Sequence, residues 1–210
     1  MKRLKFILFL ILFVFVMPLS AQTLSQSDIQ AVQQRAKAKV EEFQGYLSSI
    51  ANTALSQKQR RTAKEQALLL FMGEGDPYYV TNDQGEREYH REVRMQTSSV
   101  NRASKSMKAM KKYLDDTYNN ILKYSKVVIK SADVVRVDNV YKVGEGKYEC
   151  MAYFCQEYIS YGPDGSVKYG DVSRKKVKVY ITATPIPSVG MVYEVKLGDI
   201  YVTSTERLKK

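Results

Sequence analysis

The second half of the chain reads as a series of β-strands whose connections are too short to hold other structure. From residue 126 onward, segments rich in Val, Ile and Tyr are separated by three turns, GEG, GPDG and PIPSVG, which contain Gly and Pro. Parallel neighbouring strands would need a long crossover connection, so consecutive strands on such turns are antiparallel. We therefore expect an antiparallel meander over the last part of the chain.

The first half of the chain supplies helices that can cover this sheet. Apolar residues recur at spacings of three and four over residues 27–50, 56–71 and 105–118, which predicts three helices. The sequences SDIQ and SQKQ at the first two starts fit capping boxes. Residues 78–99 change to a period of two and predict a hairpin with its turn at residues 82–85. The expected order is helix, helix, strand, strand, helix and four strands, which is a single α+β domain.

A change of phase near the end of the chain predicts that the sheet is strongly curved. Val195 and Leu197 share one face of the last strand, whereas Ile200 and Val202 have the other parity. An extra residue at Gly198 would explain the switch, because a β-bulge bends a strand and shifts the facing of its side chains.

This element order resembles that of a known superfamily. The order and the ending LGDIYVTST are similar to the NTF2-like (cystatin-like) superfamily, in which a bent antiparallel sheet wraps a helix into a cone. The segments YGDVSRKKVKVYI and SADVVRVDNVYKVGEGKYE also resemble exported Bacteroidetes proteins of this shape. The superfamily contains isomerases, dehydratases, transport factors and binding domains, so the resemblance implies a fold and leaves the function open.

The first 21 residues have the order of a secretory signal. Basic residues are followed by an apolar run over residues 6–17 and then by the small residues Ser20 and Ala21. The run is shorter than the roughly 20 residues that span a bilayer. We therefore expect cleavage after Ala21 and an exported mature domain over residues 22–210, periplasmic or secreted and not integral to the membrane. An uncleaved signal anchor is the alternative.

The mature chain stays basic after this cleavage. Loss of Lys2, Arg3 and Lys5 removes three charges from the formal +11 and leaves +8. Outside the inner membrane the available polyanions are lipid head groups, polysaccharides and acidic proteins, so we expect no nucleic acid partner. A basic balance without any polyanion partner is the alternative.

The two cysteines lie in the strand-like sequence CMAYFC. On a strand, residues five apart are separated by roughly 16 Å, whereas the Cα atoms of a disulfide lie within about 7 Å. Cys150 and Cys155 also point to opposite faces. We expect no disulfide within the chain and two free thiols that pack as small apolar groups. An exposed thiol that joins two copies of the protein is the alternative.

Few residues are candidates for chemistry. One histidine and two divergent cysteines do not provide a set of metal ligands, and no phosphate-binding or nucleophile-elbow motif is present, so we expect no metal and no cofactor. His90 is either a solvated side chain or a general base at the cone mouth. Asp133 and Asp199 share parity with apolar residues, which would raise a carboxyl pKa, and Tyr153 could supply a hydroxyl. The alternative for each Asp is a strand-end or bulge carboxylate that binds backbone N–H groups.

Two sets of side chains could form a surface for a ligand or partner. A basic set alternates with valines on one predicted strand, and the alternative is a solvated face that discourages strand pairing. A tyrosine set surrounds the GPDG turn, and its alternative is simple coverage of the sheet. The sets are Arg174, Lys176 and Lys178, and Tyr158, Tyr161 and Tyr169.

These features lead to three hypotheses of different classes. The first is an exported, non-enzymatic domain that binds a small apolar ligand or a protein partner in the cell envelope. The second is an isomerase or dehydratase of the ketosteroid isomerase type, with Asp133 or Asp199 as base and a tyrosine as donor, as the resemblance implies. The third is a structural subunit of a homodimer or larger envelope assembly, paired through the open face of the sheet.

Overall fold

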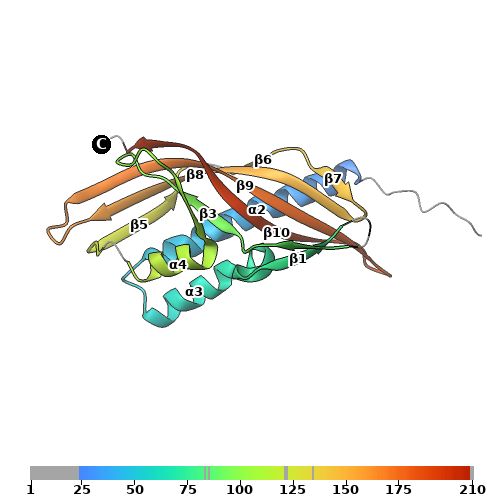
Figure 1. The fold of residues 1–210 in the computed structure, drawn as a ribbon, viewed down its shortest axis with the longest axis horizontal. Helices are drawn as coiled ribbons and strands as arrows, with labels where there is room; N and C mark the ends of the chain where they lie inside the picture. Colours follow the sequence, from blue (N-terminus) through green and yellow to red (C-terminus); the bar gives the residue numbers. More distant parts are fainter. Residues whose placement is uncertain (1–23, 83, 85, 121–122, 134, 209–210) are drawn as a thin grey trace, which may run out of the picture.

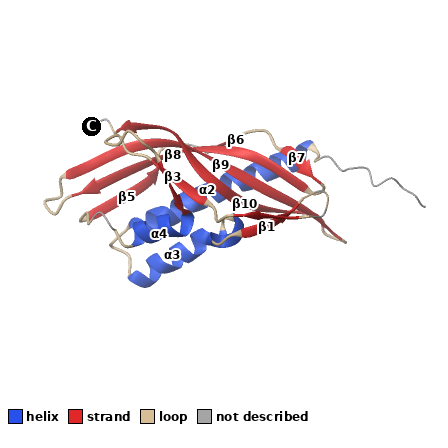
Figure 2. Cartoon of the chain, viewed as in Figure 1, coloured by secondary structure: helices blue, strands red, loops and turns tan. Residues whose placement is uncertain are grey.

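The protein is described by a computed structural model over residues 24–208, apart from residues 83, 85, 121–122 and 134. The expected signal at residues 1–21 lies outside this part. Helices gather on one side of a long, curved sheet, as Figure 1 and Figure 2 show. The helices are α2 (Gln26–Ala51), α3 (Gln57–Leu69) and α4 (Met110–Tyr118), with a short 3-10 turn, η1 (Met72–Gly75).

The main sheet has eight strands in the order β4-β3-β10-β9-β8-β5, and β6 and β7 pair with β8 beyond β5. A separate two-stranded sheet pairs β1 with β2. The bounds are β1 (Tyr78–Thr81), β2 (Arg87–His90), β3 (Arg94–Thr97), β4 (Ser106–Ala109), β5 (Lys126–Ser131), β6 (Arg136–Val137), β7 (Tyr141–Gly144), β8 (Lys147–Tyr161), β9 (Val167–Ile186) and β10 (Gly190–Arg207).

The expected α+β class is confirmed, and the meander β8-β9-β10 is antiparallel as predicted. The sheet as a whole is mixed, because β3 joins β10 in parallel through the pair Met95 and Ile200. The stretch read as one strand from residue 126 is three short strands, β5, β6 and β7, each of which pairs with β8. Long β8 therefore offers one continuous edge to three successive partners.

The third helix starts later than its apolar spacing suggested. Residues 106–109 form strand β4, in which Met107 pairs with Gln96 of β3. The backbone N–H of Met110 then donates to the carbonyl of Val93 at 2.8 Å and ends the ladder where the helix begins. Strand pairing with β3 therefore outweighs the helical spacing of the apolar residues in this segment.

Both N-terminal helix starts carry capping boxes. In α3 the box is the expected one, between Ser56 and Gln59. In α2 the box joins Ser25 and Asp28, two residues earlier than predicted, because Ser25 has the extended backbone of an N-cap. The predicted apolar stripe of α2 is buried against the sheet, and Phe43 meets Phe71 edge-to-face at 5.0 Å between ring centroids.

The bend expected near Gly198 is confirmed. The pairing of β10 with β9 shifts between Leu197 and Ile200, and both residues are fully buried. A Cβ atom at Gly198 would lie 2.6 Å from Cε2 of Tyr180, so the close approach of this ring requires glycine. The bulge therefore directs the apolar side chains on both sides of it toward the helices, while the sheet curves around these helices.

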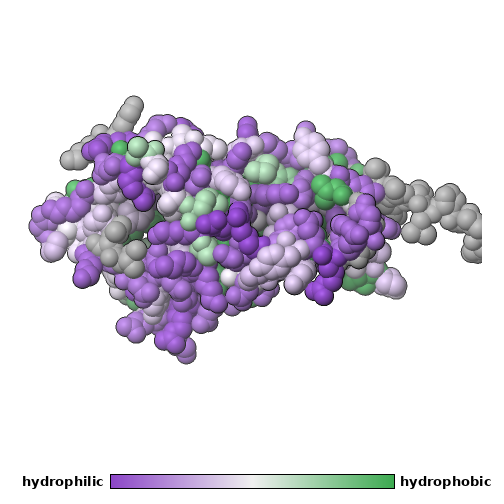
Figure 3. Space-filling model, viewed as in Figure 1, coloured by the Kyte–Doolittle hydropathy of each residue, from purple (hydrophilic) through white to green (hydrophobic). Residues whose placement is uncertain are grey.

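The outer surface of the helical layer is hydrophilic. Figure 3 shows polar colouring over most of the viewed face, including α3. No helix in the described part of the chain is long and apolar enough to cross a membrane.

Candidate functional site

The concave side of the sheet holds a cavity of about 440 Å³ at the end that α4 covers. Its floor is formed by β8 and β9, and its other walls are α4, the end of β3, the connection from β3 to β4, and residues that follow α4. A volume of this size is typical of small-molecule sites. The cavity is the candidate functional site.

Strand alternation sets the floor of the cavity. Along β9, Asp171, Ser173 and Lys175 point inward, on the face that Val177 continues toward the apolar core. In the antiparallel ladder, Ser173 lies opposite Gln156 of β8. Their side chains therefore share the inward face, and Lys175 is the diagonal neighbour of Gln156.

Lys175 is a deeply buried lysine in this floor. Only 6% of the residue is exposed, and its Nζ donates to Oε1 of Gln156 at 2.7 Å. The amide of Gln156 also meets the hydroxyl of Tyr113, which reaches in from α4. Burial lowers the pKa of Lys175 to about 7, although the Asp171 carboxylate acts in the opposite direction. A substantial fraction of this amine is therefore uncharged at neutral pH.

Asp171 lies four residues before Lys175 on the same face of β9 and has a partner of its own. The hydroxyl of Tyr169 donates a hydrogen bond to the Asp171 carboxylate, and its oxygen lies 2.9 Å from Oγ of Ser99. Burial raises the pKa of Asp171, and the Tyr169 hydrogen bond and the charge of Lys175 only partly offset this effect. The cavity floor thus holds a carboxyl group and an amine whose charged forms are both disfavoured by burial.

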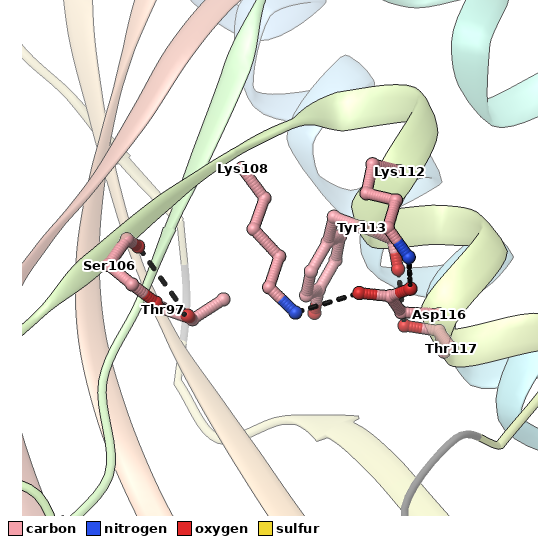
Figure 4. A network of polar contacts seen from close by, with 7 residues as sticks. All are labelled: Thr97, Ser106, Lys108, Lys112, Tyr113, Asp116 and Thr117. Atoms are coloured by element: carbon pink, nitrogen blue, oxygen red, sulfur yellow. Dashed lines mark hydrogen bonds and ion pairs between the residues drawn. The ribbon is translucent and has the colours of Figure 1, made fainter.

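The opposite wall carries a fixed ion-pair cluster. Lys108 of β4 lies 2.7 Å from Oδ2 of Asp116, and Lys112 contacts the other oxygen of the same carboxylate from α4. Figure 4 shows both lysines directed at Asp116, with Tyr113 beside them. Burial raises the pKa of Asp116, but the hydrogen bonds and charges of the two lysines outweigh it and hold the pKa below its usual value. This carboxylate stays ionised at neutral pH.

Aromatic rings provide flat apolar surface between these groups. Tyr158 of β8 and Tyr169 of β9 meet edge-to-face, with 6.0 Å between ring centroids. Burial raises the pKa of Tyr158, so its hydroxyl remains a neutral hydrogen-bonding group. The site can therefore take a flat ring and present neutral hydroxyls, the amine of Lys175 and the carboxyl group of Asp171 to the polar atoms of that molecule.

The two carboxylates singled out from the sequence lie outside the cavity. Asp133 is exposed in the turn after β5, because the strand ends at Ser131 and its parity no longer applies. Asp199 lies at the β10 bulge, where it accepts the backbone N–H of Arg94 at 2.8 Å and the hydroxyl of Tyr201 at 3.1 Å. The alternative expected for a bulge Asp, a carboxylate that binds a backbone N–H group, describes Asp199.

Neither Tyr153 nor His90 lines the cavity. Tyr153 lies on the convex face, with Arg136 4.6 Å above its ring and a hydrogen bond to Asp138 that raises its pKa. His90 belongs to the β1-β2 hairpin and stacks on Tyr78 at 5.2 Å between ring centroids. The structure does not bring these two residues together with each other or with Asp133 and Asp199.

The two predicted surface sets separate in the structure. The basic set stays together on the convex face of β9, where Arg174 pairs with Glu206 at 2.6 Å and Lys178 pairs with Glu149 at 2.8 Å. In the tyrosine set, two members line the cavity and the third lies under the ammonium of Lys126. The members are Arg174, Lys176 and Lys178, and Tyr158, Tyr161 and Tyr169.

The thiols face away from each other. Cys150 is buried, Cys155 is half-buried, and both are free. Burial raises the pKa of Cys150 to about 12, so this group is an unreactive thiol. Among residues 24–208 outside the gaps given above, no three His, Cys, Asp or Glu side chains gather into a group that could hold a metal ion.

The sequence analysis missed Lys175 and Asp171, the buried lysine and aspartate of the cavity floor. A signal for them was present, because both share the parity of Val177 and therefore the buried face of β9. The more regular basic set, Arg174, Lys176 and Lys178, occupies the even positions of the same strand and was interpreted as the functional pattern. Charged residues on the apolar parity of a strand are the pattern that could have found the site.

No protein-family model and no curated protein sequence matches the chain. Among solved structures, it is similar to an NTF2-like superfamily protein from Salmonella enterica serovar Typhimurium, at 13% identity and a TM-score of 0.42 over 83% of this chain and 91% of the other. It is also similar to a candidate scytalone dehydratase from Novosphingobium aromaticivorans, at 11% identity and a TM-score of 0.42 over 88% and 93% of the two chains. A third likeness is to the Kfla4162 protein from Kribbella flavida, at 11% identity and a TM-score of 0.37 over 82% and 94%. At such identities and TM-scores, no activity is carried over to this chain.

Proposed function

We propose that this protein binds a small organic molecule in the cavity on the concave side of its sheet. The ligand has a flat ring and at least one oxygen-bearing polar group. The ring lies against Tyr158 and Tyr169, and the polar group faces Lys175. The single observation that carries the proposal is the burial of Lys175 in the wall of a cavity large enough for such a molecule.

Burial of this amine lowers stability, which is why it supports a function. A buried ammonium loses its hydration, and the neutral amide of Gln156 replaces only part of that loss. A methionine or leucine at the same position would pack against Val177 without this cost. Strongly perturbed titratable groups in a cavity are a common sign of a binding or catalytic site.

We propose the cell envelope or the exterior as the place where this binding occurs. The support is the basic, apolar and small-residue order of residues 1–21, which is typical of an exported chain. Binding of a small molecule fits the first hypothesis from the sequence, with one change: the ligand needs a polar group as well as apolar surface.

A second candidate function is an isomerase or dehydratase that uses a carboxylate base. The observation that favours it is the raised pKa of Asp171 inside the cavity, next to the hydroxyl of Tyr169. The base in this version is Asp171, whereas the sequence had suggested Asp133 or Asp199. Turnover of a bound carbonyl compound with solvent hydrogen exchange, lost in Asp171→Asn, would favour the enzyme over the binding protein.

Binding is tested with two probes of one shape, 2-naphthoate and 2-naphthalenemethanol, by thermal shift and native mass spectrometry. We expect one bound molecule per chain, and weaker binding of the anion by about tenfold in Lys175→Met, from the loss of one charge-assisted hydrogen bond. The matched control is Lys176→Met, because Lys176 is next in sequence but points to the convex face. If neither probe binds, or if both variants change binding equally, the proposed site is wrong.

A further inference from the structure

The lysines in and near the cavity differ in their partners. Lys108, which lines the cavity, and Lys112 share the carboxylate of Asp116 in ion pairs. Lys175 instead donates to the neutral amide of Gln156. Its nearest acidic neighbour on the strand, Asp171, is hydrogen-bonded to Tyr169.

Burial makes Lys175 a candidate nucleophile. The residue is 6% exposed, and burial lowers its pKa to about 7. An uncharged, buried amine is the activated form of lysine that attacks carbonyl carbons. Its position in the cavity lining places this amine where a bound molecule can reach it.

Hydroxyl groups that can donate protons line the same cavity as the amine. Tyr113 of α4 contacts Gln156, which accepts the hydrogen bond from Lys175, and Tyr169 is hydrogen-bonded to Asp171 on the same strand as Lys175. Burial raises the pKa of both tyrosines, so these hydroxyls keep protons that they can donate, and burial also raises the pKa of Asp171. Attack of an amine on a carbonyl needs such groups, because the departing oxygen must be protonated.

We propose that Lys175 forms an imine with an aldehyde or ketone carried by the cavity's ligand. This proposal rests on the proposed function and narrows its ligand class to carbonyl compounds. The lone pair of Nζ forms a bond to the carbonyl carbon, the carbonyl oxygen takes up a proton from a cavity hydroxyl group, and the attacked nitrogen returns one proton to that group. The second N–H proton then passes to the new hydroxyl oxygen as the carbon–oxygen bond breaks. Water leaves, a carbon–nitrogen double bond remains, and no oxidant or reductant is consumed.

The test uses 2-naphthaldehyde with sodium cyanoborohydride at neutral pH, because the reductant converts an imine into a stable secondary amine. Intact mass and peptide mapping should show one adduct per chain, equal in mass to the aldehyde less its oxygen, on Lys175. Since an ordinary lysine has a pKa near 10.4, labelling at Lys175 should exceed that at any other lysine by more than about tenfold. Lys175→Arg and Lys175→Met should lose this adduct, and Lys176→Met should keep it. Circular dichroism verifies that each variant is folded.

Binding of 2-naphthalenemethanol separates the two proposals, because this alcohol has the shape of the aldehyde but forms no imine. If the alcohol binds while the aldehyde labels surface lysines with no preference for Lys175, the imine is wrong and the proposed function stands. If the alcohol does not bind and Lys175 is not labelled preferentially, both are overturned. Preferential labelling that survives in Lys175→Arg would place the nucleophile elsewhere and also overturn the imine.

Discussion

The two faces of β9 show how much the surroundings of a lysine decide its chemistry. Lys175 and Lys176 are neighbours in sequence, yet one is buried in the cavity wall and the other lies on the convex face with Arg174 and Lys178. On the convex face, Arg174 and Lys178 form ion pairs with the carboxylates of Glu206 and Glu149. On the concave face, burial lowers the pKa of Lys175 to about 7. The same side chain is thus a surface charge on one face and a candidate nucleophile on the other.

A new charge on the inner face should have the largest effect. In Val177→Lys, an ammonium enters the apolar core beyond Lys175, where it has neither a cavity nor a carboxylate beside it. We expect the free energy of unfolding to fall by about 4 kcal/mol or more, or the fold to be lost. The matched change on the outer face, Lys176→Val, should alter it by less than about 0.5 kcal/mol. Urea denaturation measures both, and equal effects would abolish the distinction between the faces.

Replacement of Lys175 by methionine should change how stability depends on pH. The folded-state pKa of Lys175 is about 7 and the unfolded value is 10.5, so between these values the unfolded chain binds more protons. The native chain therefore gains stability as pH rises through this window and loses it as pH falls toward 7. The difference amounts to at most about 5 kcal/mol.

Lys175→Met lacks this dependence, so it should be the more stable protein below pH 7 and lose that advantage by pH 10. Urea denaturation at several pH values gives the difference between the two proteins. Parallel curves would show that Lys175 keeps an ordinary pKa. The other titratable groups of the cavity are common to both proteins, namely Arg102, Lys108, Tyr113, Asp116, Tyr124, Tyr158, Tyr169 and Asp171.

Loss of the carboxylate on the opposite wall should have an intermediate effect. Asp116→Asn leaves Lys108 and Lys112 without their shared anion and should cost about 2 kcal/mol at pH 7. Because the folded-state pKa of Asp116 lies below 3.8, its contribution is present above that pH and disappears as pH falls through the folded value. The stability difference between Asp116→Asn and the native chain should therefore shrink in strong acid. A constant difference would mean that the carboxyl acts through packing alone.

The bulge and the cavity floor differ in how far sequence could predict them. The parity switch between Leu197 and Ile200 lies within one strand, so the bend at Gly198 could be read from local pattern alone. Lys175 also has a readable parity, but parity says only which face it occupies. Whether that face is filled or hollow depends on where α4 and the β3-β4 connection lie, more than fifty residues earlier in the chain.

The carboxylate candidates failed to reach the cavity for a related reason. Asp133 was placed on an apolar face by extending the period of β5, but that strand stops at Ser131 and the chain turns before β6 pairs with β8. Asp199 was placed correctly near a bulge, and the bulge itself directs its oxygens to the Arg94 backbone. A period holds only as far as its strand, and no local pattern marks where the ladder to β8 is interrupted.

Removal of the ion pair between Arg174 and Glu206 on the convex face should have the smallest effect on stability. Arg174 lies 2.6 Å from Glu206, but both side chains are more than half exposed, so solvent and salt screen the pair. Arg174→Ala should lower the free energy of unfolding only slightly, and by less at high salt than at low salt. It should leave the binding of 2-naphthoate unchanged, because the sheet separates this guanidinium from the cavity. A loss of probe binding in Arg174→Ala would mean that the two faces of β9 are coupled, and that the outer charges, like Lys175, belong to the site.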